Sequence, residues 1–172
     1  MLTCLPYWLT FSTSPSAEFL SDELLREVPV NRQEFENLRD LRGKRIVGDI
    51  VWDSPRDGKP NLVFDQIPVE NSAGWDVILN GTYKPGIPAL TFNFVLRGSG
   101  PICRIDVNGT IHGAAGRTHK HDLRRDDDPR KNLLTAVPGP DLDNKSVVEV
   151  WNSLCVAANI EHVGTLRDPE QP

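Results

Sequence analysis

The sequence predicts an α+β protein in which an antiparallel β-meander sheet of about five or six strands packs against a C-terminal helix, with an N-terminal helical arm. After residue 43, short runs rich in Val, Ile, Phe and Trp alternate with Gly, Pro, Asp and Asn, which is typical of strands joined by tight turns. Helical patterns precede and follow these runs. The 172 residues, 38% of them hydrophobic, suffice for one domain with a sizeable core.

Residues 1–43 are expected to form the N-terminal arm and a helical hairpin. Apolar side chains recur at helical spacing in residues 16–27, and Pro29 ends this pattern. A second apolar stripe predicts a helix over residues 32–41, which Gly43 ends.

Residues 44–166 are expected to form the core domain. The predicted strands span residues 45–52, 62–67, 75–83, 90–97 and 102–107. Turn-forming pairs such as Asn80-Gly81 and Asn108-Gly109 lie between these runs or near their ends. Because the connections are short, neighbouring strands should pair antiparallel. Apolar and polar residues alternate along residues 90–97, which indicates a sheet with one covered face.

A C-terminal helix over residues 147–159 should cover that face. Ser146 and Glu149 match a capping box, and apolar residues then line one side of the helix. Residues 122–143 hold three prolines and few apolar residues, so a long surface loop is expected there. The tail, residues 167–172, is expected to fray.

No run approaches the roughly 18 to 20 apolar residues of a membrane span, and we expect no membrane partner. Residues 1–17 lack a basic residue ahead of their apolar stretch, so they are not expected to be a signal peptide. Cys4, Cys103 and Cys155 are far apart and form no CxxC pair. We therefore expect no disulfide framework, and the cytoplasm is the expected compartment. Composition leaves the oligomeric state open.

The segment that follows the last predicted strand is the main candidate for a chemical site. The net charge of −5 argues against a protein that coats nucleic acid through its overall field. Residues 97–131 nevertheless hold eight basic and five acidic residues, together with three of the four histidines. This segment is therefore the region most inclined to attract anions.

Strand alternation arranges the polar residues of this segment. It places Arg104, Asp106 and Asn108 on one face of a strand. A hairpin through the glycine-rich turn at residues 113–116 would then bring three imidazoles together, those of His112, His119 and His121.

Three interpretations of this cluster remain open. Three histidines with Asp106 or Asp122 offer the nitrogen and oxygen ligands that zinc or manganese accept. Alternatively, one imidazole acts as general base and another as general acid on a phosphodiester, without a metal. In the third interpretation the histidines only make structural hydrogen bonds in a polar hairpin.

We assign the candidate residues according to the second interpretation. The catalytic candidates are His112, His119, His121, Arg104 and Asp106, and the substrate-binding candidates are Asn108, Arg117 and Lys120. No metal ligand and no cofactor are assigned, and a divalent metal stays the alternative.

The order Arg104-Ile-Asp106-Val-Asn108-Gly, His112 and His119-Lys120-His121 resembles toxin-antitoxin proteins of the TumE type. It is also similar to an uncharacterised family of mobile-element proteins. The resemblance covers about 20 of the 172 residues. It implies an intracellular toxin or defence protein that acts on RNA, with an antitoxin or a defence-complex subunit as partner. The competing hypothesis is a non-enzymatic interaction protein of a phage, mobile element or defence system, and a metal-dependent hydrolase is the third.

Overall fold

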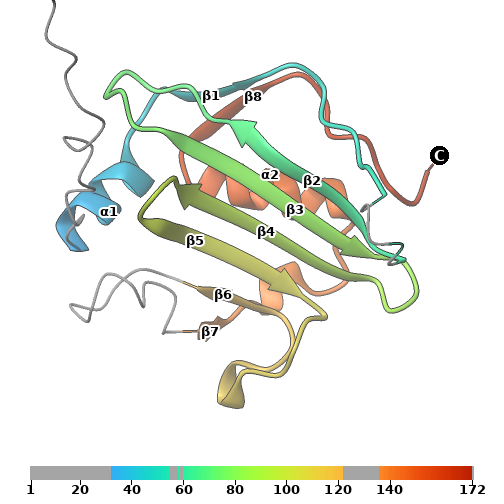
Figure 1. Ribbon diagram of the computed structural model, residues 1–172. Helices are drawn as coiled ribbons and strands as arrows, with labels where there is room; N and C mark the ends of the chain where they lie inside the picture. Colours follow the sequence, from blue (N-terminus) through green and yellow to red (C-terminus); the bar gives the residue numbers. More distant parts are fainter. Residues whose placement is uncertain (1–31, 55–57, 59, 122–135, 172) are drawn as a thin grey trace, which may run out of the picture.

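The computed structural model describes residues 32–54, 58, 60–121 and 136–171, and these form an α+β fold, as predicted (Figure 1). The predicted helix at residues 16–27 lies outside the described residues. In chain order the elements are α1 (Arg32–Asp40), β1 (Lys44–Val47), β2 (Leu62–Pro68), β3 (Val77–Lys84), β4 (Ala89–Leu96), β5 (Gly100–Val107), β6 (His119–His121), β7 (Ala136–Pro138), α2 (Val147–Ala157) and β8 (Ile160–Val163).

Six strands form one antiparallel sheet in the order β2-β3-β4-β5-β6-β7. Each strand pairs with the next one along the chain, so the predicted meander is confirmed. The pairing of β3 with β4 is continuous from Val77 opposite Leu96 to Lys84 opposite Ala89. The predicted turn pair Asn80-Gly81 lies inside β3 rather than at its end, because a ring of β2 packs on Gly81 in the space where a side chain would stand.

One face of the sheet is apolar and packs on α2, which lies behind the sheet in Figure 1. The ring of Phe92 on β4 lies 5.3 Å from that of Trp151 on α2, edge to face, and the ring of Phe64 on β2 lies 5.9 Å from the same indole. All three side chains are buried. Burial of each such side chain contributes about 1.5–3 kcal/mol, so this contact holds the sheet on the helix.

Helix α2 begins with the predicted capping box. The backbone N–H of Glu149 donates to the Ser146 hydroxyl at 3.3 Å, and the backbone N–H of Ser146 donates to the Glu149 carboxylate at 2.8 Å. The helix ends at Ala157, two residues earlier than predicted, because Asn159 has a φ of 50° and the chain turns into β8.

Two segments depart from the prediction. The run predicted as a meander strand at 45–52 is strand only at β1, which pairs in parallel with β8 in a separate two-stranded sheet. Gly48, with a φ of 100°, interrupts that ladder, but Ile50 resumes the parallel pairing with a bridge to Leu166. Further along, Asp53 forms an antiparallel bridge with Val63 of β2. In the predicted loop at 122–143, residues 122–135 lie outside the described residues, but β7 pairs with β6 and completes the six strands.

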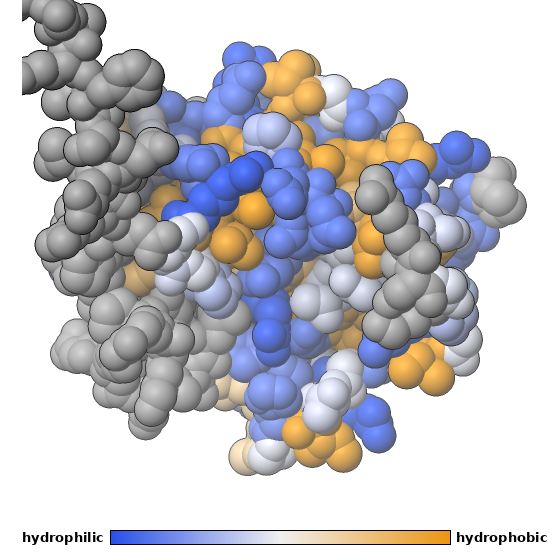
Figure 2. Space-filling view, in the orientation of Figure 1, coloured by the Kyte–Doolittle hydropathy of each residue, from blue (hydrophilic) through white to orange (hydrophobic). Residues whose placement is uncertain are grey.

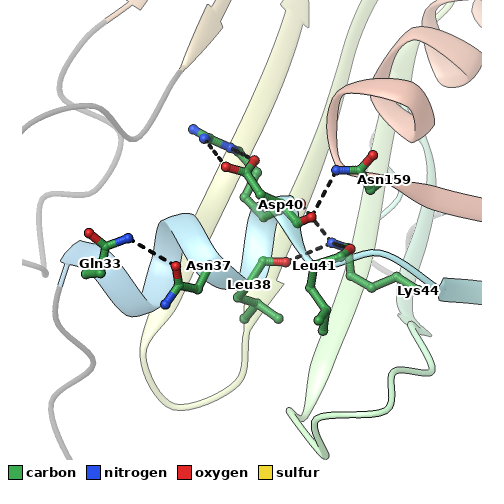
Figure 3. A network of polar contacts seen from close by, with 8 residues as sticks. Gln33, Asn37, Leu38, Asp40, Leu41, Lys44 and Asn159 are labelled. Atoms are coloured by element: carbon green, nitrogen blue, oxygen red, sulfur yellow. Dashed lines mark hydrogen bonds and ion pairs between the residues drawn. The ribbon is translucent and has the colours of Figure 1, made fainter.

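Helix α1, the described part of the predicted N-terminal helical arm, packs against the core. Phe35 and Leu38 are buried against the sheet. The wholly buried Lys44 donates to the carbonyls of Leu38, Arg39 and Leu41 at the end of the helix (Figure 3). Burial lowers the pKa of Lys44 to about 8, so the ammonium group remains protonated at pH 7 and complements the negative end of the helix dipole.

The tail after Leu166, expected to fray, makes hydrogen bonds to the core. The backbone N–H of Arg167 donates to Ile50 and its carbonyl accepts from the indole of Trp52. The hydroxyl of Tyr83 donates to the carboxylate of Glu170.

Within the part of the chain that the structure describes, no helix is long and apolar enough to cross a membrane.

Candidate functional site

The candidate site is built on the β5–β6 hairpin. Asn108, with a φ of 51°, takes the chain out of β5, and the backbone N–H of Gly109 donates to the carbonyl of Arg117 at 3.0 Å. Further out, the N–H of His112 donates to the carbonyl of Gly116 at 3.0 Å. Gly116 has a φ of 74°, a conformation that glycine adopts readily. The loop is thus closed on itself.

The register of the hairpin places four polar side chains on the face of the sheet opposite α2. Arg104 pairs with His121, and Asp106 pairs with His119. On the other side of β5, Asp106 pairs with Thr91 of β4. Figure 2 shows hydrophilic residues gathered over the middle of this face.

The three imidazoles meet, as the spacing predicts. The ring centroid of His112 lies 4.5 Å from that of His119 and 5.2 Å from that of His121, and the last two are 5.0 Å apart. One ligand nitrogen from each ring lies within 4.8 Å of the others, so the three histidines could hold a metal ion. His119 and His121 are buried, whereas His112 is exposed.

His119 is the most unusual member of the cluster. Its side chain is 1% exposed, and neither ring nitrogen has a well-aligned hydrogen-bond partner among the described residues. Burial lowers the pKa of His119, against the opposing effect of the Asp106 carboxylate, which lies 3.4 Å from Nε2. The charges of His112 and Arg104 lower the pKa further, and a contact with the backbone of Gly116, too poorly aligned to count as a hydrogen bond, raises it. The imidazole is therefore neutral near pH 7 and keeps a lone pair for a proton or a ligand.

Asp106 organises the rest of the site. Its carboxylate accepts a hydrogen bond from the Thr91 hydroxyl at 2.8 Å and one from Nε of Arg104 at 2.7 Å. Nη2 of the same arginine lies 2.9 Å from Nε2 of His121. Since a guanidinium only donates, Nε2 of His121 accepts, which assigns the ring proton of neutral His121 to Nδ1.

A pocket of about 180 Å³ opens beside these groups. It is lined by Thr82, Lys84, Ala89, Thr91, Arg104, Asp106, Gly109, Thr110, His112 and His119. Two of the lining side chains are basic, those of Lys84 and Arg104, and two are imidazoles. This combination suits an anionic group that gains or loses a proton during reaction.

Three residues predicted to bind substrate do not converge on the pocket. The amide of Asn108 donates to the carbonyl of Pro88, and the guanidinium of Arg117 donates to that of Gly109. Lys120 lies on the other face of β6 from the histidines, because it stands between them on a strand, and it forms an ion pair with Asp141 at 2.6 Å. Asp122 lies outside the described residues.

Thr91, Thr82 and Lys84 complete the pocket, although none was predicted to be part of it. Thr91 is one of the polar positions in the alternating pattern of residues 90–97. Correct prediction of the β4–β5 register would therefore have placed it beside Asp106. Thr82 pairs with Thr91 on the next strand. Lys84 comes from the end of β3, and the sequence holds no signal that separates it from other surface lysines.

The fold and site define an α+β protein with a histidine-rich polar face on an antiparallel sheet. Comparison with protein-family models, curated proteins and solved structures found no match for this chain.

Proposed function

We propose that this protein cleaves phosphodiester bonds in RNA by acid–base chemistry in the pocket beside His112, His119 and Arg104. One observation carries the proposal. A buried, neutral imidazole without an aligned partner faces an exposed imidazole, with 4.5 Å between the ring centroids, in a pocket that also holds two cations. A base and an acid on the same phosphate need such an arrangement.

RNA is the favoured substrate because it carries its own nucleophile. The 2′-hydroxyl oxygen attacks phosphorus, His119 accepts the hydroxyl proton, and the 5′-oxygen leaves with a proton from His112. The products are a 2′,3′-cyclic phosphate and a 5′-hydroxyl. Before the next turnover His119 releases the proton that it accepted, and His112, which is exposed, takes up a proton from solvent.

The remaining groups support this chemistry. Arg104 lines the pocket and can stabilise the charge that develops on the phosphate oxygens. Asp106 holds the guanidinium and lies beside His119, and His121 accepts a hydrogen bond from the other end of Arg104. We assign Asp106 and His121 as positioning residues.

The likeness to TumE-type proteins supports a toxin or defence role for this activity inside the cell, with an antitoxin or a defence-complex subunit as partner. Local charge supports an anionic substrate, because residues 97–131 hold eight basic and five acidic side chains in a protein of net charge −5.

The test uses purified full-length protein without a histidine tag, incubated with end-labelled RNA and with DNA of the same sequence, in the presence of a chelator. The wild type should cleave RNA alone and leave a 2′,3′-cyclic phosphate. His119→Asn and His112→Asn should each lower the rate about 10²–10⁴-fold. Arg117→Met is the matched control, since Arg117 does not line the pocket and its guanidinium donates to the backbone carbonyl of Gly109.

No cleavage by the folded wild type, or equal cleavage by His119→Asn, would refute the proposal. The first result would favour the competing class, a non-enzymatic protein that binds a partner.

A further inference from the structure

We propose that His112, His119 and His121 also bind one transition-metal ion of the zinc type, and that the bound metal and RNA cleavage exclude each other. The metal site rests on the ligand geometry alone. The mutual exclusion rests on the proposed function, so the two parts can fail separately.

The ligand nitrogens are close to the spacing that a metal requires. They lie within 4.8 Å of one another, and tetrahedral zinc with Zn–N bonds of 2.0–2.1 Å needs nitrogens about 3.3 Å apart. His112 can move closer to the other two ligands, because it is exposed on a loop beside Gly113. His119 and His121 are held in register on β6. The ion would thus meet two placed ligands and one adaptable ligand.

His119 supplies an independent reason to expect a ligand. Burying a polar group without a good hydrogen bond costs free energy, and both ring nitrogens of this side chain lack an aligned partner among the described residues, although Asp106 and the backbone of Gly116 lie nearby. A metal ion on one nitrogen would offset that cost. Three imidazoles favour zinc, copper, nickel or cobalt over magnesium or calcium, which prefer oxygen ligands.

Arg104 competes with the metal ion for a ligand nitrogen of His121. Its Nη2 atom occupies the lone pair of His121 Nε2 at 2.9 Å, and its positive charge repels a cation. Metal binding through this nitrogen therefore displaces the guanidinium. Removal of Arg104 should tighten metal binding while it weakens RNA cleavage, and this opposite response separates the two activities of the site.

Metal binding and RNA cleavage exclude each other because both use the same ring nitrogens of His119 and His112. His119 needs its lone pair to take the proton of the 2′-hydroxyl, and His112 needs a protonated nitrogen to donate to the leaving oxygen. A metal ion on the cluster occupies both nitrogens. The loaded protein then holds neither the base nor the acid.

Isothermal titration of tag-free protein with zinc chloride, at pH 7.5 and without chelator, tests the site. We expect one equivalent bound by the wild type and binding about 10–100-fold weaker in His119→Asn and in His112→Asn. Arg104→Met should bind at least about 10-fold more tightly. Arg117→Met should bind as the wild type does, since its guanidinium is exposed and hydrogen bonded to Gly109.

Absence of saturable binding, or equal affinity in the wild type and both histidine variants, would overturn the metal site. Weaker or unchanged binding by Arg104→Met would overturn the competition, even if the histidine variants failed to fold. RNA cleavage should fall in proportion to zinc occupancy, and faster cleavage by the zinc-loaded protein would overturn the exclusion. Histidine-dependent binding by a protein that never cleaves RNA would uphold the metal site and refute the proposed function.

Discussion

His119 lies directly across from Asp106 in the β5–β6 pair, and its Nε2 atom is 3.4 Å from the carboxylate. The same carboxylate holds Arg104 at 2.7 Å and Thr91 at 2.8 Å. One buried acid therefore links three strands of the sheet, and changes to it should affect both the stability and the chemistry of the site.

Asp106→Asn should lower the free energy of unfolding by about 2–3 kcal/mol, because it leaves the partly buried Arg104 without its charge partner. Thr91→Val is the control and should cost only about 1 kcal/mol, since it removes one neutral donor. Urea unfolding monitored by tryptophan fluorescence measures both. Equal losses in the two variants would show that the charge pair contributes nothing beyond an ordinary hydrogen bond.

Acid should destabilise the protein through His119. Burial lowers the pKa of this side chain from its ordinary value of 6.5, so below that pH the unfolded chain binds a proton that the folded protein does not. The free energy of unfolding therefore falls as the pH drops through 6.5. Urea unfolding between pH 7.5 and 5 should show a smaller fall in His119→Gln than in the wild type. Parallel curves would contradict this assignment.

Lys44→Met should lower the free energy of unfolding by about 2–4 kcal/mol, because three buried or partly buried carbonyls at the end of α1 lose their shared donor. Hydrogen exchange should quicken in α1. The neighbouring Arg45→Met is the control, with an expected change within about 0.5 kcal/mol. Its ion pair with Glu161, at 3.3 Å, has both side chains largely in solvent. Similar losses in both variants would refute the capping role of Lys44.

Gly81→Ala should cost about 1–3 kcal/mol, since an added Cβ would lie 2.3 Å from Cε1 of Phe64, a buried ring on the neighbouring strand. Gly86→Ala should change the free energy of unfolding by less than about 0.5 kcal/mol, because no atom lies within 4 Å of its Cβ position. Thermal unfolding distinguishes the two. A Gly81→Ala protein as stable as Gly86→Ala would mean that the ring moves without cost.

The fold class could be predicted because local signals and packing agree in its central part. Alternation in β4, the capping box of α2 and the short connections all specify the same sheet and helix. The partner of β1 could not be predicted, since a parallel pairing with β8 depends on a segment more than a hundred residues away. Strands as short as β7 carry too few residues to show a period.

The candidate site was predictable in its central part for the same reason. Arg104 and Asp106 are two residues apart on β5, as His119 and His121 are on β6. All four therefore fall on one face of the sheet when the hairpin forms in register. The positions of the predicted substrate-binding residues outside the pocket were not predictable. Arg117 and Asn108 have the residue types of substrate-binding groups, but each donates a hydrogen bond to a backbone carbonyl in a loop, that of Gly109 or of Pro88. Side-chain type alone does not reveal which acceptor is nearest.

The parallel pair of β1 and β8 joins Lys44 to Ile160, and the hydroxyl of Thr165 donates to Asp49 across 116 positions of chain. Contacts of such long range raise the contact order and slow folding, because a large loop must close before they form. The β3–β4–β5 meander, which has only near neighbours, should form first and set the β5 face on which the site is built. The closing of the long loop through β1 and β8 is then expected to be the slow step on the folding pathway.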